Sequence, residues 1–424
     1  MAHGRSELAG IIASGTIRSV YQPIVDLRSG DTLGYEALAR GPEDSSLRSP
    51  DALFPAARTE GRLDELDWTC RASALAGAMN AGLRAPTALF VNGEPEVFSS
   101  DCPAAHEPLL RLARDKLKVV HEVTERGLVE QPAEMLRAVE EMRGEDWGIA
   151  LDDLGADWRS LALLPFVRPD VVKLDMDLVA EPLDDRATRL ASAARAYADW
   201  SGAQVLAEGL ETEIHVERAL TLGATLGQGW LFGRPGPLGS TTPLPRSNAA
   251  PLLGKQPAIR DETPVEIVEA LLPMLEGTKG ELLRHSIELE QRAQDLEDAA
   301  VVLGTFQTAE RFTPATRRRY SALADGSAFV AAFGAGLTER PAPGVRGASF
   351  PANHRLLGEW NVVVVAPHFA GALVARDLGD EGPDAERRFS YALTQDRDIV
   401  VRAGRALMLQ ITALADSRAE RSAA

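Results

Sequence analysis

The amino-acid sequence predicts an α/β fold in two parts, a TIM-like (β/α)8 barrel followed by a smaller α/β domain. The chain has 424 residues, enough for two or three domains of about 150 residues each. Short apolar runs alternate with amphipathic segments through its first half, as in βα units. A stretch rich in Pro, Gly, Ser and Thr then follows. We therefore expect a domain at residues 1–237, a linker at 238–262 that few contacts bridge, and a domain at 263–424.

Six apolar runs predict the strands of the first domain. Amphipathic segments at Leu63–Met79, Ala133–Met142 and Ala187–Trp200 predict helices between them. At least six βα units within about 235 residues favour a barrel, and a doubly wound open sheet is the alternative. The predicted strands are SVYQPIVDL (19–27), TALFVN (87–92), LKVVHE (117–122), WGIALDD (147–153), PDVVKLD (169–175) and AQVLAE (203–208).

The second domain is predicted to begin with a helix over Glu281–Leu303. Leucines recur in it at every seventh position, which allows a weak coiled-coil seam, although packing on its own domain is the simpler interpretation. The runs AFVAAFGAGL (328–337) and WNVVVVAP (360–367) predict buried strands, and Asp398–Ile411 predicts a final helix. The basic cluster Arg317–Arg319 could contact a phosphate, but a solvated helix face is the favoured interpretation.

Composition excludes several classes of protein. The formal charge is −17, from 45 basic and 62 acidic residues, which argues against binding to a nucleic-acid polymer. No apolar run approaches the roughly 18 residues that span a bilayer, and Met1–Gly15 does not resemble a secretory signal. Only Cys70 and Cys102 occur, too few for a disulfide framework or a zinc site. These features predict a cytoplasmic protein with no membrane partner. Divalent metals would let such an acidic protein bind a phosphate ester.

Polar side chains gather at the carboxyl ends of the predicted strands, which meet at one mouth of a barrel. Five carboxylates in one pocket would raise one another's pKa unless cations lay among them. Oxygen ligands without His or Cys favour Mg²⁺ or Mn²⁺, and the adjacent aspartates could hold two ions. The lysine could form a salt bridge to either aspartate, or orient a metal-bound water. The residues are Glu36, Asn92, Glu122, Asp152, Asp153, Lys173 and Glu208.

The motif YEALAR at Tyr35–Arg40 contains the Glu-Ala-Leu signature of the EAL family of cyclic di-GMP phosphodiesterases. Further blocks follow in family order over residues 15–237, so the first domain resembles that family. The resemblance implies hydrolysis of cyclic di-GMP to linear pGpG with two Mg²⁺ or Mn²⁺ ions, and a homodimer. The blocks are YQPIVDL, VN at 91–92, HEVTERG, ALDDLG, VVKLD, AEGLET and GQGWLFGRP.

The resemblance also implies roles for single residues. Glu36, Asn92, Glu122 and Asp152 match its first set of metal ligands, and Asp153 and Glu208 match its second. Glu208 also matches a general base, Lys173 the lysine at the attacking water, and Glu211 a supporting acid. Arg40, Gln22 and Gln228 match residues that contact the substrate, and Glu125 matches the anchor of the following loop.

That loop departs from the family pattern. The chain has DDLGADWRS, with Leu154 in place of Phe and Arg159 in place of Ser. In the family the loop is thought to connect metal binding with dimer contacts, so the change bears on turnover and regulation. Two readings from other classes therefore stay open beside the phosphodiesterase: a catalytically silent cyclic di-GMP receptor, and a protein-interaction scaffold.

The second domain resembles the DICT sensory domain over about residues 265–415. The resemblance is carried by RFTPATRRRYSALA, GVRG, LGEWNVVVVAPHFAGALVARDLGD and RRFSYALTQDRDIVVRAGRALM. It implies a regulatory module but names no general ligand. The signal or partner of this domain therefore stays open.

Overall fold

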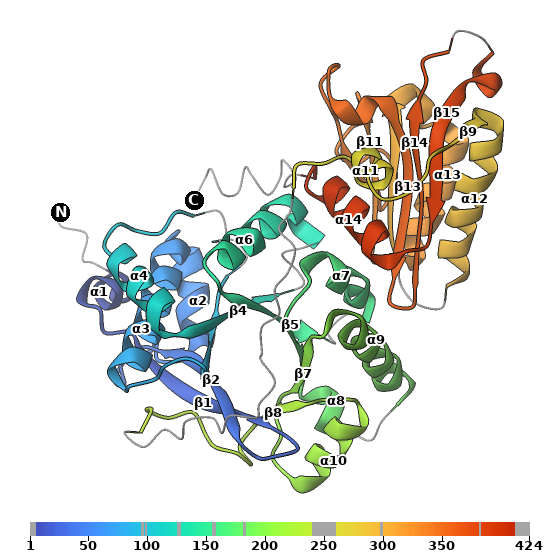
Figure 1. Cartoon of the computed structure of the whole chain (residues 1–424). Helices are drawn as coiled ribbons and strands as arrows, with labels where there is room; N and C mark the ends of the chain where they lie inside the picture. The colour runs from blue at the N-terminus through green and yellow to red at the C-terminus, as the bar shows by residue number, and fades with distance from the viewer. Residues whose placement is uncertain are drawn as a thin grey trace, which may run out of the picture.

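The structure is a computed structural model that describes residues 6–94, 97, 100–124, 129–154, 158–180, 184–239, 260–296, 300–380 and 383–411. Residues 240–259, most of the predicted linker, lie outside this part. Figure 1 shows a barrel built by the first half of the chain and a separate sheet with its own helices built by the second. Among the described helices, none is long and apolar enough to cross a membrane.

Eight strands close into a barrel in chain order, which excludes the open doubly wound sheet. Strands β2 to β8 are parallel, whereas β1 runs antiparallel to both of its neighbours, β2 and β8. The predicted βα repeat therefore holds except at the first strand. The strands are β1 (Arg18–Asp26), β2 (Thr32–Arg40), β3 (Ala88–Asn92), β4 (Lys118–Thr124), β5 (Gly148–Leu154), β6 (Val171–Leu174), β7 (Gln204–Ala207) and β8 (Leu226–Gln228).

Helices surround the barrel, and the three that the sequence predicts lie within two residues of their expected bounds. The helix α9 begins at an Asp184 side chain that accepts the Ala187 N–H, and it ends at Gly202 in the left-handed conformation. The helices are α1 (Glu7–Ser14), α2 (Pro50–Thr59), α3 (Leu63–Asn80), α4 (Glu107–Lys116), α6 (Pro132–Gly144), α7 (Leu164–Val167), α8 (Asp177–Ala180), α9 (Asp185–Ser201) and α10 (Glu213–Thr221).

The second domain is a seven-stranded sheet in the order β12-β11-β10-β13-β14-β15-β9. Its strands β10, β11 and β12 are parallel and the others antiparallel. Its elements are α11 (Pro264–Glu269), β9 (Leu275–Thr278), α12 (Lys279–Asp295), β10 (Val301–Thr308), α13 (Pro314–Gly326), β11 (Phe329–Ala335), β12 (Arg346–Ala348), β13 (Glu359–Ala366), β14 (Phe369–Asp377), β15 (Arg388–Thr394) and α14 (Arg397–Met408).

Successive residues along a strand of this sheet pack into two different apolar clusters, one on each face of the sheet. Val362 and Val364 of β13 pack with α12 and α13 on one face. Val363 and Val365 pack with α11 and α14 on the other. Figure 1 shows α11 and α14 on the opposite side of the sheet from α12 and α13. This is the two-residue period of a strand that is buried on both faces.

The predicted helix over Glu281–Leu303 is too long, because α12 ends at Asp295 and Leu303 lies in the buried strand β10. Two β-branched residues, Val301 and Val302, begin that strand. The leucine spacing therefore marks no coiled-coil seam. The helix packs on its own domain, as the simpler interpretation had it.

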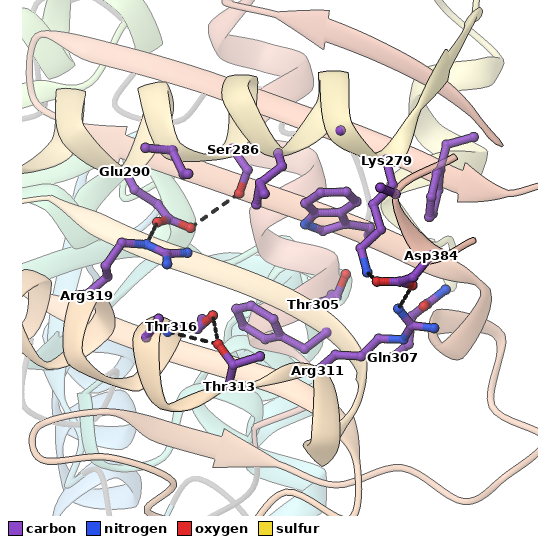
Figure 2. A pocket seen from close by; sticks show the side chains of 18 of the residues that line it. Lys279, Ser286, Glu290, Thr305, Gln307, Arg311, Thr313, Thr316, Arg319 and Asp384 are labelled. Carbon is purple, nitrogen blue, oxygen red and sulfur yellow. Dashed lines mark hydrogen bonds and ion pairs between the residues drawn. The ribbon is translucent and has the colours of Figure 1, made fainter. Parts of the chain in front are cut away.

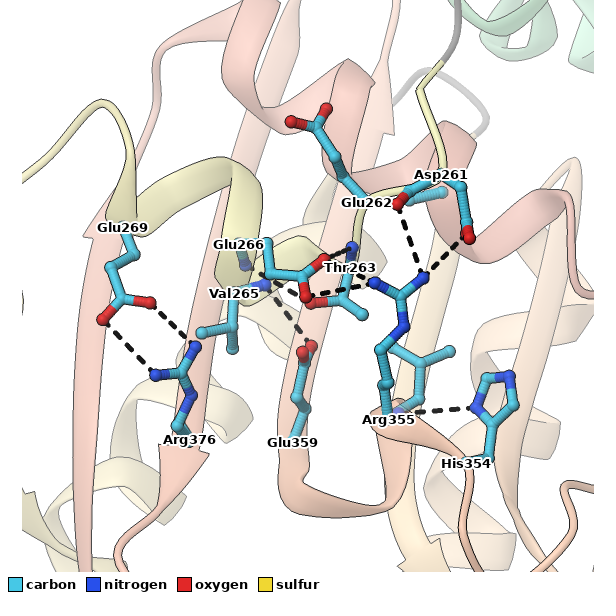
Figure 3. A network of polar contacts seen from close by, with 12 residues as sticks. Asp261, Glu262, Thr263, Val265, Glu266, Glu269, His354, Arg355, Glu359 and Arg376 are labelled. Atoms are coloured by element: carbon cyan, nitrogen blue, oxygen red, sulfur yellow. Dashed lines mark hydrogen bonds and ion pairs between the residues drawn. The ribbon is translucent and has the colours of Figure 1, made fainter.

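A polar network fastens α11 to the sheet (Figure 3). Thr263 and Glu266 form a capping box at its first turn. The buried Glu359 accepts the Val265 N–H at 3.4 Å, and burial raises the pKa of Glu359. Arg355 bridges Glu266, at 2.9 Å, and Asp261. The first described residues of the second domain are therefore fixed to its sheet by hydrogen bonds and ion pairs.

The helix α14 packs against the barrel, and one apolar core extends through both domains. Gly404 lies so close to Phe166 of α7 that an added Cβ would be 2.6 Å from its ring. The nearly buried Arg405 pairs with Glu140 of α6 at 2.8 Å. The Ala133 N–H donates to the Ile411 carbonyl at 3.2 Å. These contacts contradict the expectation that few contacts bridge the linker.

A fragment of residues 1–239 should therefore be less stable than the whole chain. It exposes Phe166 and its apolar neighbours and leaves Glu140 unpaired, and each large apolar side chain contributes about 1.5–3 kcal/mol when buried. Urea unfolding of the fragment should show a loss of several kcal/mol, or the fragment should aggregate. The control is the whole chain cut at a protease site inserted at residues 240–259, whose halves should stay together. A fragment as stable as the whole chain would show that the shared core contributes little.

Candidate active site

The candidate residues form a polar layer directly above the apolar interior of the barrel. Ile24, Phe90, Val120, Ala150, Val171, Leu206 and Leu226 make up most of the buried cluster inside it. In strands β3 to β8 the candidate residue lies two positions further along, toward the carboxyl end. In the reversed β1 it lies two positions earlier. Side chains two apart on a strand share a face, so the residues that pack the barrel also align its polar layer. The pairs are Phe90 and Asn92, Val120 and Glu122, Ala150 and Asp152, Val171 and Lys173, Leu206 and Glu208, Leu226 and Gln228, and Ile24 and Gln22.

The Lys173 side chain, 1% exposed, is the centre of this layer. Its Nζ lies 2.9 Å from Glu122 Oε1, 3.0 Å from Asp152 Oδ1 and 2.9 Å from Glu208 Oε1. Glu36 Oε1 is further away, at 3.8 Å. The salt bridge from Lys173 to Asp152, one of the two predicted alternatives, is therefore present, and three glutamates share the same ammonium.

Amide side chains hold Glu36 in place. Asn92 Nδ2 donates to Glu36 Oε1 at 3.0 Å, and Gln228 Nε2 donates to Glu36 Oε2 at 2.6 Å. Gln228 also donates to Gln22 Oε1 at 3.2 Å. The structure thus brings Gln22, Asn92 and Gln228 together around one carboxylate, and orients that carboxylate toward the mouth.

Charge and burial compete strongly in this cluster. Burial lowers the pKa of Lys173, but Glu122 and the other carboxylates outweigh it and raise the pKa of Lys173 well above its usual value. Burial and repulsion from Glu36 raise the pKa of Glu122 well above its usual range. Burial raises the pKa of Glu208 to about 7, against the attraction of Lys173. The carboxylates therefore carry more negative charge than one ammonium satisfies.

The donor set fits a hard divalent cation. Every acidic or amide side chain of the layer offers oxygen, which suits Mg²⁺ or Mn²⁺. The buried Glu122 has Lys173 as its cation, with the ammonium 2.9 Å from Oε1. As they lie, the carboxylates surround Lys173. Within the described ranges, no three acidic, His or Cys side chains are grouped around an ion position of their own.

Solvent reaches the cluster from one side. The side chains of Asp152 and Glu208 are 16% and 24% exposed, against 1% for Glu122. A cavity of about 480 Å³ opens beside Glu36 and Asn92. Such a volume suits a small-molecule ligand. An incoming ligand would therefore meet Asp152, Glu208 and Glu36 before Glu122.

The remaining predicted residues lie differently. Arg40 is half-buried at the end of β2 and donates to the Ala39 carbonyl at 2.8 Å. Glu211 is exposed, and its backbone N–H donates to His215 Nδ1 at 3.3 Å. Asp153 is in β5, but its side chain lies outside the described part. Glu125 and residues 155–157 of the altered loop also lie outside it.

Sequence reasoning missed the basic lining of the cavity. Arg58 of α2 and Arg71 of α3 both border it. Arg71 is buried and pairs with the buried Asp67 at 2.5 Å, and Arg58 pairs with Glu94 at 2.5 Å. The signal that could have found Arg71 is the pair Asp67 and Arg71, four residues apart on the mostly apolar face of α3, because charges are rarely buried without a partner.

Comparison with known proteins places this geometry in a family. The family model described as EAL domain matches residues 5–235, more than half of the chain, and the chain belongs to the EAL domain family. A second family model, the sensory domain in diguanylate cyclases and two-component systems (DICT), matches residues 268–378. The chain is therefore an EAL barrel joined to a DICT domain.

Two curated relatives resemble the barrel. The cyclic di-GMP phosphodiesterase RocR of Pseudomonas aeruginosa is 30% identical over 229 residues, 53% of this chain and 58% of RocR. The Escherichia coli protein "Probable cyclic di-GMP phosphodiesterase PdeB" is 29% identical over 225 residues, 50% of this chain and 42% of PdeB. The chain thus spans about half the length of these relatives.

Solved structures also resemble the barrel. A Klebsiella pneumoniae BlrP1 calcium/cy-diGMP complex is 27% identical, covers 52% of this chain and 56% of its own, and has a TM-score of 0.47. The PaMucR phosphodiesterase c-di-GMP complex is 27% identical, covers 55% of this chain and 96% of its own, and has the same TM-score.

Proposed function

We propose that this protein is a metal-dependent phosphodiesterase that hydrolyses cyclic di-GMP to linear pGpG under the control of its DICT domain. The observation that carries the proposal is the set of four carboxylates around the buried Lys173 at the mouth of an EAL barrel. The names of RocR and PdeB support the same substrate and reaction. Each residue predicted to bind the metal is of the type that the family has at that position. This favours an enzyme over a silent receptor.

Different residues of the site would have different roles in the reaction. Glu36, Asn92, Glu122, Asp152, Asp153 and Glu208 would hold the metal. When bound, Mg²⁺ or Mn²⁺ neutralises charge on the phosphate and makes water a better nucleophile. Glu208, on the open side and 2.9 Å from Lys173, accepts the proton of the attacking water. Lys173 keeps that carboxylate and Asp152 in fixed positions.

Substrate binding falls to groups nearer the solvent. Arg40 would contact a phosphate, for which a planar guanidinium is suited. Gln22 and Gln228, which are hydrogen-bonded to each other, would orient the dinucleotide, and Gln228 also donates to Glu36. Arg58 lines the neighbouring cavity and adds a second positive group on the approach side.

Activity should disappear in excess chelator and return with Mg²⁺ or Mn²⁺. Ca²⁺ should restore it poorly, because calcium takes longer bonds and more ligands and would misplace the attacking water. Chromatography for pGpG after incubation with cyclic di-GMP measures this, and dinucleotide binding is measured in parallel. Full activity in chelator would overturn metal dependence. Binding without cleavage under every metal would favour the silent receptor.

We propose that control passes through the contact between α14 and the barrel. The 3₁₀ helix at Trp158–Leu163 and α7 follow directly in sequence from the Asp152 strand and the altered loop. Phe166 of α7 contacts Gly404 of α14, and Arg168 pairs with Asp398 at 3.7 Å. A shift of α14 would therefore act on the segment that leads back to Asp152.

Replacing Gly404 by Val should change the rate of pGpG formation by about 2- to 30-fold, the range expected for a coupling of 0.5–2 kcal/mol. The valine would meet the Phe166 ring and displace α7. Gly10→Val in α1 is the matched control, since a Cβ there meets nothing within 4 Å. Equal rates for both variants, with equal thermal unfolding, would exclude this route.

A further inference from the structure

The C-terminal domain contains a cavity of about 510 Å³ between α12, α13 and the sheet (Figure 2). It lies on the face of the sheet opposite α14, away from the barrel. Its volume falls in the range of small-molecule sites. None of its residues belongs to the site described above, so its ligand is a separate question from the proposed phosphodiesterase activity.

One wall of the cavity is aromatic. Phe306, Trp360 and Phe389 line it, and the rings of Trp360 and Phe389 meet edge to face with centroids 5.7 Å apart. Leu283 and Ile287 of α12 line it as well. A flat ring would bury its faces between these groups, because aromatic pairs favour offset and edge contacts.

One end of the cavity holds a buried carboxylate. Glu290 is 3% exposed and accepts hydrogen bonds from Arg319 Nε at 2.7 Å and from Ser286 Oγ at 3.3 Å. Figure 2 shows these three side chains together at one end. Burying a carboxylate beside a cavity is costly, so a hydroxyl or ring N–H of a ligand would find a strong acceptor there. Arg317 and Arg318 are exposed, as the predicted solvated helix face requires, whereas Arg319 is partly buried by its pair with Glu290.

The opposite end holds two cations that share one surface acid. Lys279 and Arg311 line the cavity and both pair with Asp384, Arg311 at 3.0 Å, and Arg387 outside the cavity lies 3.5 Å from the same carboxylate. The Asp384 side chain is 62% exposed, and exposed ion pairs contribute little to stability. A ligand carboxylate at this end could therefore replace Asp384 while Asp384 turns to solvent.

The backbone is also unusual at this end. Gln307 lines the cavity with a φ of 60°, at a bulge where β10 loses register with β11. Its amide donates to Asp377 Oδ2 at 3.1 Å. A non-glycine residue in the left-handed region costs about 1 kcal/mol or more and is found preferentially at ligand-binding positions.

We propose that this cavity binds a small aromatic carboxylic acid. The ring packs against Phe306, Trp360 and Phe389. The carboxylate takes the place of Asp384 beside Lys279 and Arg311, and a hydroxyl or ring N–H at the far end donates to Glu290.

Calorimetric titration of the whole chain tests this, with indole-3-acetate and 4-hydroxyphenylacetate as probes. We expect dissociation constants between about 1 µM and 1 mM, as for small ligands of this size. The neutral indole-3-acetamide should bind about tenfold more weakly or worse, and the cation tryptamine should not bind. The absence of binding by both acids, or equal binding of acid and amide, would overturn the proposal.

Two pairs of variants locate the site. Ala315→Trp fills the exposed cavity mouth on α13 and should abolish binding, whereas Ala322→Trp on the same helix lies outside the cavity and should not.

Asp384→Asn removes the competing acid and should strengthen binding of the acids about threefold or more, with the amide unchanged. Glu386→Gln, on the exposed neighbouring position, should change nothing. Retained binding in Ala315→Trp, or weaker binding in Asp384→Asn, would contradict the assignment.

Discussion

Replacing Lys173 by Met should destabilise the protein by about 3–5 kcal/mol in chelator at neutral pH, the cost of leaving buried charges without a partner. The change removes the ammonium that lies within 3.0 Å of three carboxylates and within 3.8 Å of a fourth. Methionine has a similar length and no charge, so the packing of the barrel is largely kept. Urea unfolding measures the loss, and pGpG formation should fall below detection.

The control for this variant is Lys118→Met, in the same barrel. Lys118 forms an exposed pair with Asp146 at 3.4 Å, so its loss should cost no more than about 1 kcal/mol. Adding Glu122→Gln to Lys173→Met should recover part of the stability, since one of the unpartnered charges is then removed. Equal stability of Lys173→Met and Lys118→Met would show that the cluster does not depend on its central cation.

Replacing Glu208 by Gln should slow cleavage of cyclic di-GMP by about 10²- to 10⁴-fold, the usual contribution of a general base, with any weakening of metal binding in addition. The amide keeps the size and one oxygen of the carboxylate but accepts no proton. Because Arg40 and the glutamines lie elsewhere in the site, dinucleotide binding should survive. The result should be a variant that binds cyclic di-GMP and hardly cleaves it.

Rates of pGpG formation and dinucleotide affinity are measured together for this test. Glu217→Gln, an exposed glutamate of α10, is the control and should behave like the natural sequence. Unchanged cleavage by Glu208→Gln would remove Glu208 from the mechanism. Binding without cleavage by the natural sequence and the variant alike would indicate that the loop at Leu154–Arg159 has silenced the site.

The barrel and most of its polar layer could be predicted because one two-residue period controls both. A residue such as Val171 that fills the interior shares its face with the residue two positions on, and at the carboxyl end of β6 that residue is Lys173. The reversal of β1 was missed, because an apolar run carries no direction. The hydrogen bonds from Gln228 to Gln22 and to Glu36 depend on that reversal, so their geometry could not be predicted from the sequence.

Packing between distant segments was harder to foresee. The apolar residues of α14 predicted a helix. The same residues are compatible with a helix that packs on one sheet and with a helix that packs between two domains. Contacts between distant segments, such as Gly404 with Phe166 and Arg405 with Glu140, distinguish these cases. Likewise, Leu303, the last of the leucines that suggested a helix to residue 303, suits the buried strand β10 equally well. In both places the local sequence pattern indicated that the residues are buried, but not which segment they pack against.

The antiparallel first strand also bears on how the chain folds. Ile24 pairs with Gln228, residues more than 200 positions apart, and the next seam of the barrel joins β1 to β2 close by in sequence. Contacts between such distant segments form slowly, because the long intervening loop must be closed first. During synthesis β1 and β2 emerge early, but the barrel closes only after β8 has left the ribosome. Gln22 and Gln228 meet at that seam, and Gln228 holds Glu36. Closure of the barrel and orientation of its central carboxylate should therefore occur in the same late step.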